Sequence, residues 1–189
     1  MRRTGFPLLH SAGFHVITEK QPPLREKFPS PADGTAFIMT ERRKPMISIK
    51  PIQYGSPVYL ETLELRNRVM RLPLGLNIYD EDFSFEQNCV LYAAFDGEQV
   101  IGMGSMSREG DTCKVEYLCV DTAIQSRGLG RQLLEALEGA AREQGAAHIC
   151  LDARVTAQHF YERAGYHTVG EIFLLSYAPV EHILMEKDL

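Results

Sequence analysis

A short stretch that contains glycine and arginine, Gln125-Ser126-Arg127-Gly128-Leu129-Gly130-Arg131, has the residue types of a site for phosphate or diphosphate. Gly128 and Gly130 place no side chains over their backbone amides, so those N–H groups stay open to a ligand. Apolar residues recur at helical spacing from Leu129 onwards, which predicts the start of a helix. A helix start has about four unpaired amides and a partial positive charge, and two arginines add full charges here. Together these features predict an anion-binding site.

Two other phosphate-binding patterns do not match this stretch. The Walker pattern needs Gly-x-x-x-x-Gly-Lys-Ser/Thr, and the sequence contains no such run. The dinucleotide fingerprint Gly-x-Gly-x-x-Gly would need a third glycine where Leu133 stands. A tight strand-to-helix turn without a ligand stays open as the alternative interpretation.

The segment before this loop, Glu116 to Val120, is apolar with β-branched and aromatic members, which is typical of a buried strand. A strand followed by Gln125-x-x-Gly128-x-Gly130 resembles the acyl-CoA signature of the GCN5-related N-acetyltransferase (GNAT) superfamily. The resemblance implies that the loop and helix start hold the pyrophosphate of acetyl-CoA, and that the strand pairs with the pantetheine arm. The implied cofactor-binding residues are Leu118, Cys119, Val120, Gln125, Ser126, Arg127, Gly128, Leu129, Gly130 and Arg131.

A second motif, Phe160-Tyr161-Glu162-Arg163-Ala164-Gly165-Tyr166, is similar to the Phe-Tyr-x-x-x-Gly-Phe/Tyr pattern of the same family. In that pattern the tyrosine commonly protonates the thiolate of coenzyme A, which implies that Tyr161 is the general acid. A phenol with a pKa of about 10 is protonated at neutral pH and can donate. The alternative is an aromatic core residue with its hydroxyl at the surface.

Transfer of an acetyl group to an amine also needs a neutral amine, and so a base. Glu116, in the central strand, is the candidate base. A slip of one residue would move it to the other face of the sheet, and a solvated or salt-bridged glutamate is an equal alternative. His182 is the second candidate, because the ordinary pKa of histidine suits the task. Arg154 follows the next strand and could contact the cofactor or lie at the surface.

The composition narrows the functional classes. The 189 residues carry 20 Lys and Arg against 25 Asp and Glu, a net charge of −5, which disfavours general nucleic-acid binding. The four cysteines show no Cys-x-x-Cys spacing and no metal-ligand constellation, so we expect no metal and a reducing, cytoplasmic compartment. No apolar run approaches the roughly 20 residues of a membrane helix, so no membrane association is expected.

Two regions are expected along the chain. Residues 1–45 contain six of the ten prolines and no periodicity, which predicts a flexible N-terminal extension. Residues 46–189 form the predicted N-acetyltransferase domain. Its predicted strands are 46–52, 89–95, 99–106, 116–120, 147–151, 172–177 and 182–187, its helices are 57–72, 129–143 and 157–164, and 73–87 is a loop or a further short helix.

This order predicts an α/β protein with the GNAT (acyl-CoA N-acyltransferase) fold: a mixed, mostly antiparallel sheet of about seven strands flanked by about four helices. Residues 66–75 and 182–187 also resemble a bacterial subgroup, the ElaA-like and YjcF-like proteins. The resemblance implies direct acetyl transfer from acetyl-CoA to a primary amine of a small molecule or peptide. A non-catalytic CoA-binding module, another acyl-CoA and another acceptor stay open as alternatives. So does the oligomeric state, for which the family implies a homodimer as one option.

Overall fold

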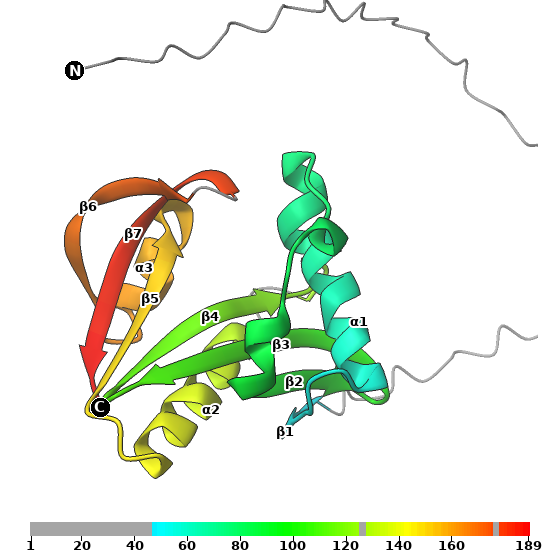
Figure 1. The fold of residues 1–189 in the computed structure, drawn as a ribbon, viewed down its shortest axis with the longest axis horizontal. Coiled ribbons are helices and arrows are strands. Elements are labelled where there is room, and N and C mark those ends of the chain that lie inside the picture. The colour runs from blue at the N-terminus through cyan, green and yellow to red at the C-terminus, as the bar shows by residue number, and fades with distance from the viewer. Residues whose placement is uncertain (1–46, 125–127, 176–177) are drawn as a thin grey trace, which may run out of the picture. The chain divides into compact units, whose positions relative to one another are not determined.

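The computed structural model describes residues 47–124, 128–175 and 178–189. The predicted extension 1–45 therefore lies outside the described residues. The strands are β1 (Ile47–Pro51), β2 (Val90–Asp96), β3 (Gln99–Glu109), β4 (Thr112–Val120), β5 (His148–Arg154), β6 (His167–Leu175) and β7 (Ala178–Asp188) (Figure 1). The α-helices are α1 (Pro57–Arg66), α2 (Leu129–Glu143) and α3 (Gln158–Glu162). A π-helical segment (Asn67–Arg71) and 3₁₀ turns at Leu72–Leu74, Ile78–Asp80, Ser84–Asn88 and Val155–Ala157 complete the described elements.

All seven strands form one sheet in the order β1-β2-β3-β4-β5-β7-β6. Only β4 and β5 run parallel, while every other neighbouring pair is antiparallel. The predicted mixed, mostly antiparallel sheet is thereby confirmed. Strand β6 lies at one edge and exposes Ile172 and Leu174. The pairing of two copies through the last strands stays a prediction.

The two parallel strands separate partway along their length. The ladder between β4 and β5 ends at the pair Val115 and Leu151, after four residue pairs. Figure 1 shows β4 and β5 starting side by side and then diverging. Beyond Val115, the edge of β4 that faces β5 has no strand partner among the described residues. A ligand can therefore approach backbone groups in the middle of the sheet.

A β-bulge lies at the point of separation. In the pairing with β3, Ser105 is opposite Tyr117 while Met106 is opposite Val115, so Glu116 is the extra residue. Bulges re-aim side chains, and here Glu116 and Tyr117 both line the same cavities. The alternation of residue types along a strand cannot reveal this shift in the pairing register between β3 and β4.

The two faces of the sheet are covered by different helices. Leu118 and Val120 of β4 pack in a cluster with Leu129 and Leu133 of α2. Cys119 lies in another cluster with residues of α1 and of the π-helical segment that follows it. Leu118 and Val120 therefore lie on the face of the sheet opposite Cys119.

Helix α1 starts as the sequence predicts. Ser56 is the N-cap, its side chain accepts from the amide of Tyr59 at 3.2 Å, and a proline occupies the first turn. The π-helical segment then inserts extra backbone, which rotates the following side chains relative to an α-helix. Leu72, the last residue of the predicted helix 57–72, is consequently 58% exposed.

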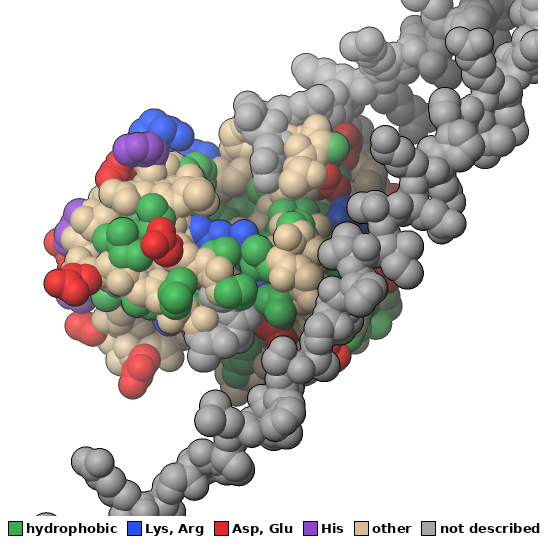
Figure 2. Space-filling view, turned by 90° about the horizontal axis from the view of Figure 1, so that it is seen from above, with side chains coloured by type: hydrophobic (Ala, Val, Ile, Leu, Met, Phe, Trp, Pro, Cys, Tyr) green, Lys and Arg blue, Asp and Glu red, His purple; other side chains and the backbone are tan. Residues whose placement is uncertain are grey.

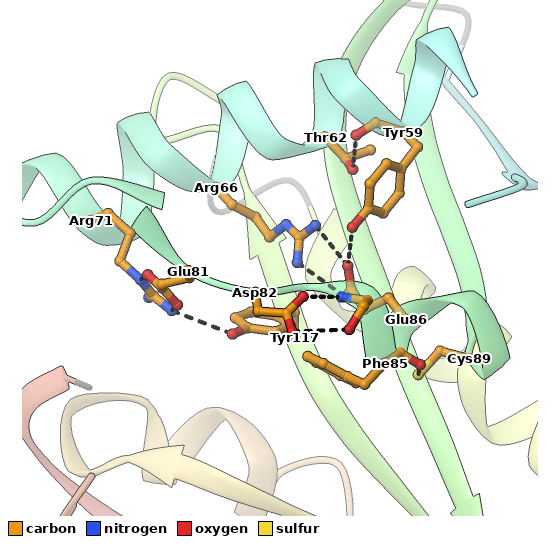
Figure 3. A network of polar contacts seen from close by, with 11 residues as sticks. Tyr59, Thr62, Arg66, Arg71, Glu81, Asp82, Phe85, Glu86, Cys89 and Tyr117 are labelled. Atoms are coloured by element: carbon orange, nitrogen blue, oxygen red, sulfur yellow. Dashed lines mark hydrogen bonds and ion pairs between the residues drawn. The ribbon is translucent and has the colours of Figure 1, made fainter. Parts of the chain in front are cut away.

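A buried ion pair ties α1 to the segment before β2. Arg66 and Glu86 have fully buried side chains and form a bidentate pair at 2.9 and 3.0 Å, and the hydroxyl of Tyr59 donates to Glu86 at 2.6 Å (Figure 3). The Arg66 guanidinium also lies over the rings of Phe83 and Tyr117, 4.7 and 4.8 Å from their centroids. This network fixes the segment that faces the divergent strands.

Candidate active site

A groove of about 740 Å³ lies at the N-terminal end of α2 and alongside α3. Its lining comes from three elements: the end of β4, the first turn of α2, and the segment from the β5–α3 connection to the end of α3. The lining residues are Leu118, Val120, Gly128, Leu129, Gly130, Arg131, Thr156, Ala157, Phe160, Tyr161 and Arg163. The groove thus contains every predicted cofactor-binding residue that the structure describes except Cys119.

The first turn of α2 presents open amides to this groove. Gly128 caps the helix in the left-handed conformation (φ +77°) without a side-chain hydrogen bond. Gln132 makes the first backbone bond, its amide donating to the Gly128 carbonyl at 3.1 Å, so the amides of residues 129–131 have no partner inside the helix. A Cβ on Gly130 would lie 3.6 Å from Phe160 and so project into the groove. This cradle fits a diphosphate.

Positive charge surrounds the same point. Arg131 donates to Glu135 at 2.8 Å and to the backbone carbonyl of Arg163 at 3.0 Å, which holds the Arg131 side chain against the end of α3. Arg163 itself is exposed and was not predicted as a cofactor residue, although it lies within the second motif. The predicted residues Gln125, Ser126 and Arg127 lie outside the described residues.

A second hollow, the inner cavity of about 130 Å³, lies where β4 and β5 diverge. Its lining residues are Met70, Arg71, Lys114, Val115, Glu116, Tyr117, Leu118, Leu151, Asp152, Arg154, Ala157, Tyr161, Leu175 and His182. Three of them, Leu118, Ala157 and Tyr161, also line the groove. The groove and the inner cavity therefore meet at these three residues.

Tyr161 is held at this junction by aromatic packing. Its ring makes edge contacts with Phe160 and Tyr166, with centroids 4.9 and 5.8 Å apart, and the residue is 9% exposed. Burial raises the pKa of the Tyr161 phenol above its ordinary value of about 10. The hydroxyl therefore stays protonated at neutral and moderately alkaline pH and can donate a proton.

Glu116 lies on the bulge of β4 and lines the same inner cavity. Its Oε1 accepts a hydrogen bond from the Ser107 hydroxyl at 2.5 Å, which orients the carboxylate. Glu116 lines the inner cavity and also a more open outer cavity of about 520 Å³. The structure thus brings the two predicted catalytic residues, Tyr161 and Glu116, to one cavity.

The outer cavity leads to the inner one, since the two share Lys114, Glu116, Tyr117, Asp152 and Leu175. Its other lining residues are Glu81, Asp82, Phe83 and Phe85. Met70 and Arg71, which line the inner cavity, come from the same stretch of chain between α1 and β2 as these four residues.

Two of the acidic residues at the outer cavity already have partners. Glu81 pairs with the buried Arg71, at 2.5 and 2.9 Å. The amide and hydroxyl of Ser84 hydrogen-bond to Asp82 and lower the pKa of that carboxyl. These carboxylates therefore mainly hold the loop in place.

Three basic side chains, from three different elements, also line the inner cavity. Arg154 and His182 are cross-strand partners of β5 and β7, and Arg71 comes from the π-helical segment. Figure 2, which views the molecule from above the view of Figure 1, shows Lys and Arg side chains near the middle of the surface, among hydrophobic ones. The His182 Nδ1 lies 2.7 Å from the Val180 carbonyl, to which it donates, so its Nε2 is the acceptor. Burial, together with the charge of Arg154, lowers the pKa of His182 and favours this neutral form.

Cys119 does not line the groove. It is in register with Met103 of β3, and its side chain is 3% exposed on the α1 face. Burial raises the pKa of the Cys119 thiol to about 12, so the thiolate, which is the nucleophilic form, is scarcely populated at neutral pH. A packing role for this side chain follows.

Two further observations concern the described residues. No helix in the ranges 47–124, 128–175 and 178–189 is long and apolar enough to cross a membrane. Within the same ranges, no three His, Cys, Asp or Glu side chains are grouped so that they could hold a metal ion.

Fold and site together define an acyltransferase that uses an acyl-CoA, and comparison with known proteins agrees. Residues 77–189 match the family model described as the acetyltransferase (GNAT) domain. The chain therefore belongs to the GNAT family and is an N-acetyltransferase. The predicted superfamily and enzyme class are confirmed. Acetyltransferases of this family act on amine acceptors.

Two relatives come from Bacillus subtilis (strain 168). A protein named as an acetyltransferase is 32% identical over 128 residues, which cover 66% of this chain and 86% of the relative. The uncharacterised N-acetyltransferase YjcF is 35% identical over 94 residues, which cover 50% of this chain and 66% of the relative. Neither name gives an acyl acceptor.

A solved structure shares the fold. The GNAT family acetyltransferase from Elizabethkingia anophelis, crystallised with acetyl-CoA bound, aligns with a TM-score of 0.57 and 18% identity. The alignment covers 76% of this chain and 98% of that one.

Proposed function

We propose that this protein transfers an acetyl group directly from acetyl-CoA to the primary amine of a small molecule. The observation that carries the proposal is the junction at Leu118, Ala157 and Tyr161. A thioester that reaches this junction from the groove meets an amine that reaches it from the inner cavity. Direct transfer in a ternary complex needs no acyl-enzyme intermediate. Cys119, which is protonated and buried, is not available as the nucleophile that would form one.

Each residue has a defined task in this reaction. Glu116 takes a proton from the acceptor ammonium, directly or through water, which frees the nitrogen lone pair to attack the thioester carbonyl carbon. As the carbon–nitrogen bond is completed, the nitrogen loses its second proton to solvent. The carbon–sulfur bond breaks at the same stage, and Tyr161 gives its proton to the departing thiolate. Exchange with solvent then restores the carboxylate of Glu116 and the phenol of Tyr161.

The backbone of β4 can stabilise the developing oxyanion. The amide of Asp121 donates to the Ile101 carbonyl of β3 at 2.9 Å. Because hydrogen-bonding directions alternate along a strand, the amide of Leu118 points to the other edge, which β5 has left. Leu118 is therefore our candidate donor to the oxyanion, at the junction where the thioester arrives.

The assignment of Glu116 predicts a pH-dependent defect. Wild-type protein should release the thiol of coenzyme A from acetyl-CoA only when a primary amine is present. Glu116→Gln should lower kcat about 10²–10⁴-fold at neutral pH, and the loss should shrink as the pH approaches the pKa of the amine, where no base is needed. Thiol release followed with a colorimetric reagent across pH measures both effects.

Two outcomes would redirect this assignment. If His182→Gln produced the pH-dependent loss and Glu116→Gln did not, the base would be His182. If the wild-type protein bound acetyl-CoA but released no thiol with any amine, the chain would be a non-catalytic CoA-binding module.

The first turn of α2 supplies a test of cofactor binding that is separate from folding. Gly130→Ala places a methyl group in the groove, yet its Cβ makes only ordinary contacts of 3.6 and 3.8 Å with protein atoms. Alanine in a helix is also favoured by about 0.5–1 kcal/mol over glycine. We expect unchanged or raised thermal stability, with affinity for coenzyme A about tenfold weaker or worse by calorimetry.

Gly139→Ala is the matched control. It makes the same substitution in the same helix, with no protein atom within 4 Å of the new Cβ. It should gain stability and keep full affinity. Equal binding by the two variants would place the diphosphate elsewhere.

A further inference from the structure

The inner cavity contains an arginine that the proposed reaction does not use. Arg154 ends β5, and its guanidinium donates to the Met70 carbonyl at 3.2 Å. No carboxylate lies within ion-pair distance of Arg154 in the part of the chain that the structure describes. Burial, together with the charge of Arg71, lowers its pKa, but an arginine stays protonated at neutral pH. The half-buried Arg154 guanidinium therefore lines the cavity with N–H groups that are available to a ligand.

Arg154 lies on the acceptor side of the sheet and away from the cofactor groove. Along β5, Ile149, Leu151 and Ala153 are buried in the cluster that contains α2 and Tyr161. Side chains alternate across a strand, so Arg154 projects to the other face. Arg154 lines the inner cavity and is not among the residues that line the groove. An anion bound by Arg154 would therefore belong to the acceptor.

The charges of the cavity define the acceptor further. Arg71 is paired with Glu81, and Lys114 is paired with Asp152 at 2.8 Å. Two charged groups have no ion-pair partner within 4 Å among the described residues: Glu116 on β4, which accepts from Ser107, and Arg154 on β5, which donates to a carbonyl. One negative charge and one positive charge without an ion-pair partner thus line the same cavity.

We propose that the acyl acceptor is a small amino acid-like molecule whose amine faces Glu116 and whose carboxylate is bound by Arg154. This inference depends on the proposed N-acetyltransferase function and names its substrate class. A monoanionic carboxylate matches the single unpaired arginine, whereas a phosphate monoester would bring about two negative charges. Guanidinium groups bind carboxylates through two parallel hydrogen bonds, and the free donors of Arg154 allow this. A small molecule suits the volume of the inner cavity, about 130 Å³.

The test compares acceptors that differ in one group. Wild-type protein is assayed with α-, β- and γ-amino acids, each beside the alkylamine that lacks the carboxylate, and with an aminoalkyl phosphate. We expect kcat/KM to be about 10- to 100-fold higher for at least one amino acid than for its alkylamine, as a charged hydrogen bond predicts. Arg154→Gln should abolish that preference by raising KM for the amino acid, with the affinity for acetyl-CoA unchanged.

Arg142→Gln is the control for loss of one positive charge, because Arg142 lies in the last turn of α2 and outside the cavity. It should keep the preference. Equal use of amino acids and alkylamines, or a preference for the phosphate, would overturn the inference while leaving the acetyltransferase function intact. If no amine of any kind were acetylated, the proposed function itself would fail, and this inference with it. The wild-type comparison decides the matter even if Arg154→Gln does not fold.

Discussion

Replacing Tyr161 with phenylalanine should lower kcat about 10²–10⁴-fold while leaving the affinity for acetyl-CoA nearly unchanged. The phenylalanine ring keeps the edge contacts with Phe160 and Tyr166, so the wall between groove and inner cavity stays intact. Only the proton donor at the junction is lost. Steady-state kinetics together with calorimetric titration of acetyl-CoA measures the two quantities separately.

The same residue predicts a feature of the pH profile. Because burial raises the pKa of Tyr161, its phenol stays protonated above the ordinary value of about 10, and wild-type activity should not fall as the pH approaches that value. A fall in activity near pH 9 with an ordinary amine acceptor would contradict this.

Tyr166→Phe is the matched control for Tyr161→Phe. It removes the same hydroxyl from a buried tyrosine five positions away, which lines neither the groove nor the inner cavity. Near-normal turnover is expected for this variant. If both variants lost turnover equally, packing around α3 rather than proton donation would explain the effect.

The features that the sequence predicted correctly depend on local patterns. Strand and helix periodicities depend on neighbours a few residues apart, and they predicted the element order and the mixed sheet. The two motifs located Gly128, Gly130 and Tyr161, which the structure places around one groove. These features can be predicted from the sequence because capping and helix initiation depend on residues that are close together along the chain.

The features that were missed depend on long-range geometry. The bulge at Glu116 exists only in the pairing with β3, so the face of this residue could not be settled from alternation. Arg71 and Arg154 are separated by more than eighty positions and meet only because β4 and β5 diverge. The one local signal for Arg154 was a polar residue at the end of a strand, and it did not distinguish cofactor, acceptor or solvent.

Glu86 lies in the segment 73–87, for which the sequence predicts a loop or a short helix, yet it is fully buried, and its removal has the largest expected effect on stability. Glu86→Ala should lower the free energy of unfolding by about 3–5 kcal/mol, because Arg66 would be left charged and unpaired in the protein interior. Chemical denaturation measures this loss. Glu135→Ala, which breaks the exposed pair with Arg131, should cost less than about 1 kcal/mol in the same experiment.

A paired substitution separates charge burial from simple loss of packing. Arg66→Met combined with Glu86→Leu removes both charges, so it should recover much of the stability lost in Glu86→Ala. The double variant should still bind its acceptor less well, because Arg66 supports the rings of Phe83 and Tyr117, which line the outer cavity. Stability that stayed as low as in Glu86→Ala would mean that the network acts through shape rather than through compensation of charge. Recovery of stability with a raised KM for the acceptor would show that the buried pair is retained to position the acceptor site.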